Sequence, residues 1–341
     1  MNKERDYIFD NSKGVLTFLV VYGHLIEYFI FRSSEAVQYI YSGIYMFHMP
    51  IFVFISGYFS KKNSEKRIIQ LFVTYMLWQK IIFPLVTSIM MGTSYSDELN
   101  AIFHPEGSYW YVLSLVIWKL IVPYFSHIKF SFIIAILAGV LVGTTEMKMN
   151  LSLFSFGRTV VFFPFFIAGY FVTKERLYQI INRIKKHWGI ILFIIVTMIG
   201  IYILYGSKDF LLEEKYINRI LYGKYIYKNI YGRDLVGIVV RFMLYIVQFA
   251  LIILFFTFMP DTNTIFTRFS RKSLAIYLTH FMLFRYINET YLKEIVYVDG
   301  MTVLCIGLIV TLVYCIFFSS GFITKIFSNI TPVNIDKLLK K

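Results

Sequence analysis

The stretch SKGVLTFLVVYGHLIEYFIF, residues 12–31, is mainly apolar, and its only acidic or basic side chains are Lys13, His24 and Glu27. A helix rises about 1.5 Å per residue, so about 20 such residues cross the roughly 30 Å hydrocarbon layer of a membrane. The stretch is therefore predicted to be a transmembrane helix. Nine segments of similar character follow it: 39–59, 68–91, 109–125, 128–144, 157–173, 187–205, 235–259, 273–290 and 301–322. The sequence thus predicts an all-α, polytopic integral membrane protein with about ten transmembrane helices.

The overall composition agrees with a lipid environment. Of 341 residues, 58% are hydrophobic and 16% are charged, whereas soluble domains have about 45–50% and about 25%. A soluble fold with so little charge could not cover its apolar surface with polar groups. We therefore expect residues 1–341 to form a single transmembrane domain with no appended soluble domain, and the first span to be retained rather than cleaved as a signal peptide.

The formal net charge of +14 comes from short basic clusters between the apolar segments. Clusters follow the second, sixth and eighth segments, and another ends the chain: Lys61, Lys62, Lys66 and Arg67; Lys174, Arg176, Arg183, Lys185 and Lys186; Arg268, Arg271 and Lys272; Lys337, Lys340 and Lys341. Ten spans would put all four clusters on one side, and short basic loops stay in the cytoplasm. Both termini are therefore predicted to be cytoplasmic, with the mixed loop 206–234 outside. Such clusters favour contact with membrane lipids over nucleic-acid binding.

Lys13 and His24 share one face of the first predicted helix. Eleven residues at about 100° each make three turns plus about 20°, and they separate the two side chains by about 16 Å along the axis. Asp10 lies on nearly the same face and could orient Lys13, while Glu27, one turn beyond His24, could hold its imidazole. Ionisable groups inside a membrane are costly and often functional. The alternative is that Lys13 snorkels to the interface and His24 bonds a neighbouring helix.

Three more polar residues are candidates for the same site. His48 enters the second span from the outer side, at a depth close to that of His24, and Pro50 follows it. His280 lies near the middle of the ninth segment, where it could form a third polar wall. Arg158 begins the sixth segment at the outer edge, where it could bind a phosphate or a sugar. Each also has a structural alternative, as a helix–helix hydrogen bonder or an interfacial cation.

Three remaining cations have structural interpretations. Lys80 is the deepest of them and needs a carboxylate or carbonyl partner, for which Glu27 is the candidate. Arg241 and Arg285 fall closer to the outer interface, and we expect both to snorkel towards water.

Cys305 and Cys315 are separated by about 15 Å of helix, which is too far for a disulfide. Neither a metal-binding spacing of Cys and His nor a phosphate-binding glycine loop occurs in the sequence, so no metal is expected.

Five motifs resemble the membrane-bound acyltransferase-3 family, most of all its fucose 4-O-acetylase-like branch. The first two are FDNSKGVLTFLVVYGH at Phe9 to His24 and FHMPIFVFISGYF at Phe47 to Phe59. The other three follow in the family's order: SYWYVLSLVIWK at Ser108 to Lys119, RTVVFFPFFIAGYF at Arg158 to Phe171, and SLAIYLTH at Ser273 to His280. The resemblance covers nearly the whole chain. It implies a multi-pass protein of the bacterial plasma membrane.

The resemblance also implies a reaction, in which an acyl group moves from cytoplasmic acetyl-CoA to a sugar hydroxyl of capsule, lipopolysaccharide, wall glycan or Nod-type factors. The family's signature of a basic residue, ten spacers and a histidine falls on Lys13 and His24. We then expect Lys13, oriented by Asp10, to hold phosphates of coenzyme A. His24 would deprotonate the acceptor or carry the acyl group transiently, with His48 assisting. Arg158, His280 and Glu27 are expected on the substrate side.

Two other functions remain open at this stage. Ten spans with deep polar residues also describe a transporter or flippase for a glycan or a lipid-linked sugar, although no inverted repeat is evident. A catalytically inactive partner in a glycan assembly complex would keep the fold and tolerate loss of His24. The expected partners are acyl-CoA, the surface glycan or its lipid-linked precursor, and membrane lipids, and a homodimer is also open.

Overall fold

The computed structural model describes residues 6–62, 64–94, 104–145, 153–321, 323 and 325. Every regular element within these ranges is a helix. The α-helices are α1 Tyr7–Ile26, α2 Glu35–Tyr58, α3 Glu65–Leu77, α4 Phe83–Met91, α5 Trp110–Phe125, α6 Ser131–Leu141, α7 Phe156–Phe171, α8 Lys174–Ile181, α9 Lys186–Gly206, α10 Arg219–Tyr222, α11 Lys228–Tyr231, α12 Asp234–Thr257, α13 Ile265–Arg271, α14 Ser273–Ile287 and α15 Gly300–Phe318. The all-α prediction is confirmed.

Each of the ten predicted spans coincides with helix. Within the described residues, seven helices are long and apolar enough to cross a membrane: Glu35–Lys61, Glu65–Met91, Gly107–Phe125, Leu153–Phe171, Lys186–Phe210, Asp234–Thr257 and Gly300–Phe318. The three others, α1, α6 and α14, are helical but shorter or more polar. The count of ten crossings and the cytoplasmic termini therefore stay predictions, and Lys337, Lys340 and Lys341 lie outside the described residues.

The third predicted span is one continuous helical run with a widened turn in it. α3 passes into α4 through a π-helical turn at Trp78–Ile82. Pro84 lies at the start of α4. A proline has no N–H to donate, and its ring collides with the carbonyl four residues back, so the i→i−4 ladder cannot continue through it. The wider turn accommodates Pro84 without ending the span.

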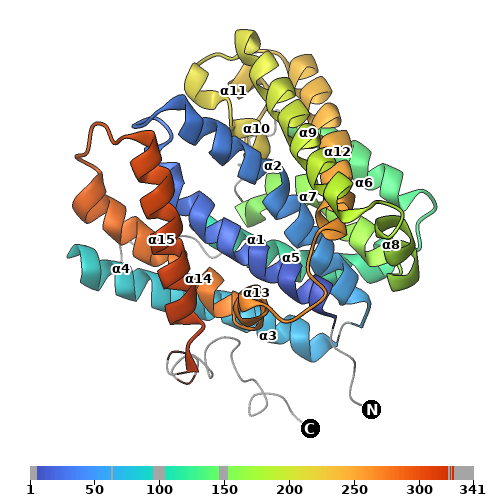
Figure 1. Cartoon of the computed structure of the whole chain (residues 1–341), viewed down its shortest axis with the longest axis horizontal. Helices are drawn as coiled ribbons and strands as arrows, with labels where there is room; N and C mark the ends of the chain where they lie inside the picture. The colour runs from blue at the N-terminus through green and yellow to red at the C-terminus, as the bar shows by residue number, and fades with distance from the viewer. Residues whose placement is uncertain are drawn as a thin grey trace.

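The helix α1 is the central element of the fold (Figure 1). It packs against α2, α13, α14 and α15, while α2 in turn packs against α7, α9 and α12. Asp6 caps the start of α1, and its carboxylate accepts a hydrogen bond from the Phe9 N–H. This central position brings the polar face of α1 against α2 and α14, the helices that carry His48 and His280.

The α2–α7 contact is close because each helix presents a glycine to the other's backbone. A Cβ atom on Gly57 would lie 1.9 Å from the Phe166 carbonyl oxygen, and one on Gly169 would lie 2.0 Å from the Phe54 carbonyl oxygen. No side chain fits either position without moving a helix. Small residues that let backbones approach are typical of helix contacts in membranes.

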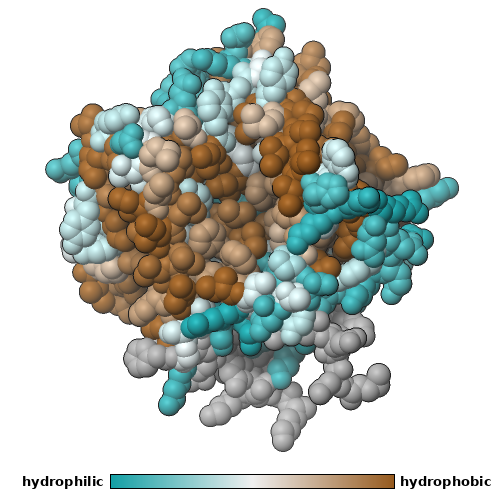
Figure 2. All heavy atoms as spheres, viewed as in Figure 1, coloured by the Kyte–Doolittle hydropathy of each residue, from teal (hydrophilic) through white to brown (hydrophobic). Residues whose placement is uncertain are grey.

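The outer surface is strongly apolar. Figure 2 shows a broad apolar area over α15 and its neighbours, with hydrophilic side chains towards the edges of this face. Exposed apolar side chains line α9 and α15 in particular: Ile190, Ile191, Leu192, Ile194, Ile195, Met198, Ile199, Met301, Ile306, Leu308, Ile309, Leu312, Val313, Ile316 and Phe317. Soluble monomers rarely expose patches of this extent, whereas lipid tails cover them at no cost.

The mixed loop predicted at 206–234 is folded. It contains α10, α11 and two short 3-10 turns, and it packs at one end of the bundle (Figure 1). The guanidinium of Arg241 on α12 donates to the Ile220 carbonyl and lies near the Tyr245 ring. Arg241 is only 2% exposed. The snorkelling expected of Arg241 is therefore wrong, because the folded loop supplies its partner inside the protein.

Candidate active site

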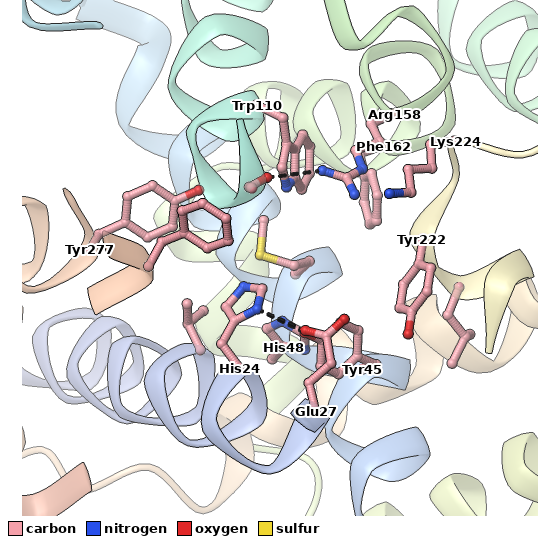
Figure 3. Close-up of a pocket in the computed structure, with 15 residues that line it drawn as sticks. His24, Glu27, Tyr45, His48, Trp110, Arg158, Phe162, Tyr222, Lys224 and Tyr277 are labelled. Atoms are coloured by element: carbon pink, nitrogen blue, oxygen red, sulfur yellow. Dashed lines mark hydrogen bonds and ion pairs between the residues drawn. The ribbon is translucent and has the colours of Figure 1, made fainter. Parts of the chain in front are cut away.

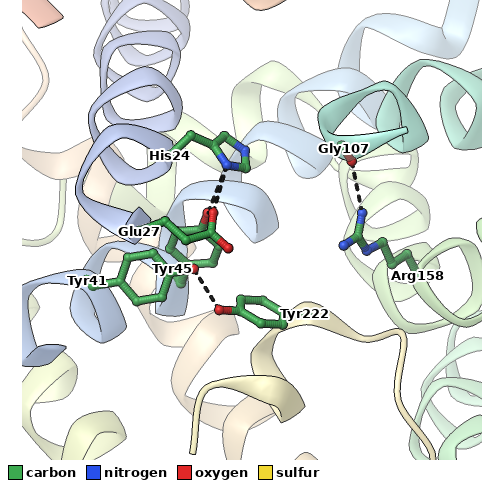
Figure 4. Close-up of polar contacts among 7 residues, drawn as sticks. All are labelled: His24, Glu27, Tyr41, Tyr45, Gly107, Arg158 and Tyr222. Carbon is green, nitrogen blue, oxygen red and sulfur yellow. Dashed lines mark hydrogen bonds and ion pairs between the residues drawn. The ribbon is translucent and has the colours of Figure 1, made fainter. Parts of the chain in front are cut away.

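His24 is held by a carboxylate and a phenol. Its Nδ1 lies 3.0 Å from Oε2 of Glu27 and 3.2 Å from the hydroxyl of Tyr45, which donates to the same Oε2 over 3.1 Å (Figure 4). When Nδ1–H is donated to Glu27, the lone pair of the ring is on Nε2. Figure 4 shows the ring turning its other nitrogen away from Glu27, towards the side where Arg158 lies. This is the arrangement of a histidine base oriented by a carboxylate.

Helical spacing accounts for these contacts. Glu27 follows His24 by three residues, at the point where α1 tightens into a 3-10 turn over Glu27–Phe29. Residues three apart on a helix are neighbours on one face. Tyr45 comes from α2 and is one turn before His48 on that helix, so both rings face α1 together.

The two other histidines lie beside this pair. His48 is buried, with its Nδ1–H donated over 2.7 Å to the Ile44 carbonyl, and its ring centre is 4.7 Å from that of Tyr45. The His280 ring centre is 5.2 Å from that of His24. His280 is 0% exposed and donates Nδ1–H over 2.7 Å to the Tyr277 carbonyl. His280 thus packs behind His24, while His48 reaches the cavity described next.

His24, Glu27, Tyr45 and His48 line one side of a cavity of about 230 Å³, the His24 cavity (Figure 3). Aromatic rings form much of the rest of its wall. The remaining lining residues are Val20, Met49, Gly107, Trp110, Arg158, Phe162, Leu221, Tyr222, Lys224, Tyr277 and Phe281. Its volume is below the roughly 300–1,000 Å³ of pockets for drug-sized ligands. The cavity therefore suits a small group, such as one sugar ring that stacks on aromatic walls.

The far end of the His24 cavity is positively charged. The Arg158 guanidinium lies 4.9 Å from the Trp110 ring centre and donates over 3.4 Å to the Gly107 carbonyl. Lys224, in the turn between α10 and α11, is solvent-exposed at the same end. Partial removal of its ammonium group from water, and then the charge of Arg158, lower the pKa of Lys224 to about 8.

Lys13 and Asp10 lie in a second cavity, of about 470 Å³, which we call the Lys13 cavity. Two further cations, Lys119 of α5 and Arg271 of α13, line it with Lys13. Lys119 donates over 2.8 Å to the Ser60 hydroxyl, and Asp10 accepts from Ser270 over 3.4 Å. Among the described lining residues, three cations face one carboxylate, which gives this lining a net positive charge suited to phosphate groups.

Tyr111 of α5 connects the walls of the two cavities. The Tyr111 hydroxyl is 2.5 Å from that of Ser56, which lines the Lys13 cavity. The Tyr111 ring centre is 5.6 Å from that of Tyr277, which lines the His24 cavity. Tyr111 therefore lies between the two spaces, at the contact of α2, α5 and α14.

The predicted site residues thus fall into two groups. The structure brings His24, His48, Glu27 and Arg158 into one cavity, with His280 behind His24, and it places Lys13 and Asp10 in the other. The suggested pairing of Lys80 with Glu27 is wrong, because Glu27 pairs with His24 and Tyr45, and the acid whose charge acts on Lys80 is Glu106. The polar lining residues that the sequence interpretation missed include Tyr45, Lys224, Lys119 and Arg271. Of these, only Tyr45 had a local signal, its position one turn before His48.

A family model described as an acyltransferase domain, acyltransferase-3, matches residues 6–320 of the chain. The matched range contains both cavities and all the predicted site residues. No solved structure matches the chain.

Two curated proteins are similar to parts of the chain. Nodulation protein NolL of Mesorhizobium japonicum is 32% identical over 121 residues, which cover 32% of this chain and 32% of the relative. Nodulation protein NolL of Sinorhizobium fredii is 27% identical over 210 residues, which cover 55% and 54%. The chain thus matches at most about half the length of these relatives.

Proposed function

The chain belongs to the acyltransferase-3 family, and from this we propose that it is a membrane O-acyltransferase that moves an acyl group onto a sugar hydroxyl. The observation that carries the proposal is the His24–Glu27 pair, 3.0 Å apart, at the wall of a small aromatic cavity. A hydroxyl is a poor nucleophile until a base takes its proton, and a histidine oriented by a carboxylate is suited to that task.

The proposed step is a direct transfer. The acceptor hydroxyl gives its proton to Nε2 of His24, and its oxygen bonds to the thioester carbon. The C–S bond then breaks, and the thiolate of coenzyme A takes the proton from the imidazolium, so that the products are a sugar ester and free thiol. Glu27 stabilises the positive charge on the imidazole during the step, as carboxylates do in other histidine-dependent acyl transfers.

We propose that acetyl-CoA is the donor and that its phosphates bind in the Lys13 cavity. Three cations, Lys13, Lys119 and Arg271, surround this space. Lys13 and His24 are about 16 Å apart along α1, a span that an extended pantetheine arm can cover. The thioester would pass Tyr111, which lies between the two cavities.

The acceptor is proposed to be a bacterial surface glycan or its lipid-linked precursor, in the plasma membrane. Support comes from the aromatic walls of the His24 cavity and from relatives that are bacterial nodulation proteins. The fucose 4-O-acetylase-like branch stays part of this proposal, since the family match does not resolve branches.

The test is the O-acetyl content of surface glycan, measured by NMR in a deletion strain of the source organism. The strain is complemented with the wild-type protein, with His24→Ala, or with His127→Ala, which removes an exposed histidine. We expect O-acetyl signals to disappear on deletion and to return with wild type and His127→Ala only. An unchanged acetyl pattern together with defective glycan export would favour a transporter instead.

A further inference from the structure

Two cations stand together at one end of the His24 cavity, opposite the His24–Glu27 pair. Arg158 extends from α7 and Lys224 from the turn after α10, and their nitrogen atoms lie close to one another in the view (Figure 3). Like charges repel, and the repulsion is stronger where protein replaces water. Such a pair is favourable when an anion lies against both members, so the arrangement itself points to a ligand.

No acid of the protein fills this role among the described residues. Arg158 contacts the Gly107 carbonyl and the Trp110 ring, and the Lys224 ammonium lies 5.2 Å from the centre of the Tyr225 ring. The charges of Glu27 and Glu106 reach Lys224, but neither forms an ion pair with it. Glu27 is already held by His24 and Tyr45.

The guanidinium of Arg158 is held in a fixed orientation. It lies over Trp110, and the bond from Nη1 to Gly107 uses one edge, which leaves other N–H groups for the cavity. A planar guanidinium with free N–H groups matches two oxygens of a carboxylate or phosphate. Lys224 adds a second charge at the solvent-exposed end, where the turn at Gly223, with φ of +67°, places it.

We propose that Arg158 and Lys224 bind an anionic oxygen group, phosphate or carboxylate, on the acceptor, so that the acceptor is a negatively charged sugar. The proposal rests on the acyl-transfer function and specifies its acceptor class. The anion at this end places the sugar ring against Trp110 and Tyr277, with a hydroxyl facing His24 across a cavity of about 230 Å³.

Calorimetric titration tests the proposal without turnover. Purified His24→Ala protein in nanodiscs of uncharged phosphatidylcholine is titrated with a hexuronate, a hexose 1-phosphate and the uncharged parent hexose, and separately with coenzyme A. We expect at least one of the anionic sugars to bind at least about tenfold more tightly than the uncharged hexose. The two anionic arms distinguish a carboxylate acceptor from a phosphate one.

Variants then assign the preference to this pair. In the same background, Lys224→Gln should remove most of the preference, Lys224→Arg should retain it, and Lys129→Gln, an exposed lysine between α5 and α6, should not change it. The proposal is overturned if charged and neutral sugars bind equally tightly, or if no sugar binds. It is also overturned if Lys224→Gln weakens the binding of coenzyme A and leaves the binding of the anionic sugar unchanged. Acetyl transfer by wild-type protein is a separate readout, so a failed acyltransferase assignment is distinguishable from a failed anion site.

Discussion

Glu27 receives hydrogen bonds from His24 and Tyr45 on the same carboxylate oxygen. Glu27→Gln keeps an oxygen that can accept from Nδ1 but loses the charge that stabilises the imidazolium. We expect kcat to fall about 100-fold or more, within the range that general base catalysis contributes. The kcat is measured from steady-state acetyl transfer by the purified protein. The KM for acetyl-CoA should not change. Tyr45→Phe removes one hydrogen bond to a charged group, worth about 1.5–3 kcal/mol, and should lower kcat by about tenfold or more. A Glu27→Gln variant with the wild-type rate would contradict the proposed role.

The lowered pKa of Lys224 predicts that the KM of an anionic acceptor depends on pH. Its pKa is lowered to about 8, so the ammonium is charged below that pH and loses its proton as the pH rises through it. The KM of an anionic acceptor should therefore rise above about pH 8, while that of a neutral acceptor stays flat. The ionisable groups that face Lys224 come from several elements: Arg158 of α7, Glu27 of the 3-10 turn after α1, Glu106 before α5, Arg219 and Tyr222 of α10, and Tyr225 in the turn that follows.

The control for this pH profile is Lys224→Arg, because arginine keeps its charge throughout the range. The rise in KM should be absent from this variant. A rise of the same size in Lys224→Arg would mean that another group titrates.

The residue-scale prediction was most successful for contacts within one helix. The three-residue spacing of His24 and Glu27 predicts their pairing, and the spacing of Lys13 and Asp10 predicts a shared environment. Contacts between segments were not predictable in this way. Lys224 reaches the His24 cavity because the loop 206–234 folds over it. The acid whose charge acts on Lys80 is Glu106, from another segment, and not Glu27.

At the scale of elements, the α2–α7 contact gives a stability prediction. Gly57→Ala places a methyl group on the Phe166 carbonyl, so the helices must separate or the chain must strain. Overpacking of this kind costs about 1–3 kcal/mol, and we expect a lower Tm in detergent, measured by thermal unfolding. Gly206→Ala is the matched control, because nothing lies within 4 Å of the added atom. An equal Tm for Gly57→Ala and wild type would show that this contact is looser than described.

Hydropathy identified the long helices but not the short ones. Each predicted apolar segment is helical because burial in lipid needs every backbone group to be bonded within the segment. The short helices α8 and α13 are polar or amphipathic, and side-chain caps start them, at Thr173 and Thr264. Their signals are local hydrogen bonds, which a search for apolar runs does not detect.

For the whole molecule, the two cavities imply a direction across the membrane. The Lys13 cavity includes Arg271, from a loop predicted to be cytoplasmic, and the His24 cavity includes Lys224, from a loop predicted to be outside. The predicted sides of the two loops are tested with single-cysteine variants. Lys215→Cys and Arg176→Cys are each made in a chain that also carries Cys305→Ser and Cys315→Ser. In intact cells an impermeant maleimide should label Lys215→Cys only, and Arg176→Cys should need permeabilisation. Labelling of both positions from one side would contradict the predicted topology.

The central claim is that His24 is the base of an acyl transfer, and its most direct test is transfer by the purified protein. Wild type, His24→Ala and His127→Ala in nanodiscs are given acetyl-labelled acetyl-CoA and unacetylated glycan from the deletion strain. The label in glycan and the released thiol are then measured. We predict equal amounts of both from wild type and His127→Ala, and a loss of at least about 100-fold from a folded His24→Ala protein. Transfer by His24→Ala at the wild-type rate would contradict the account.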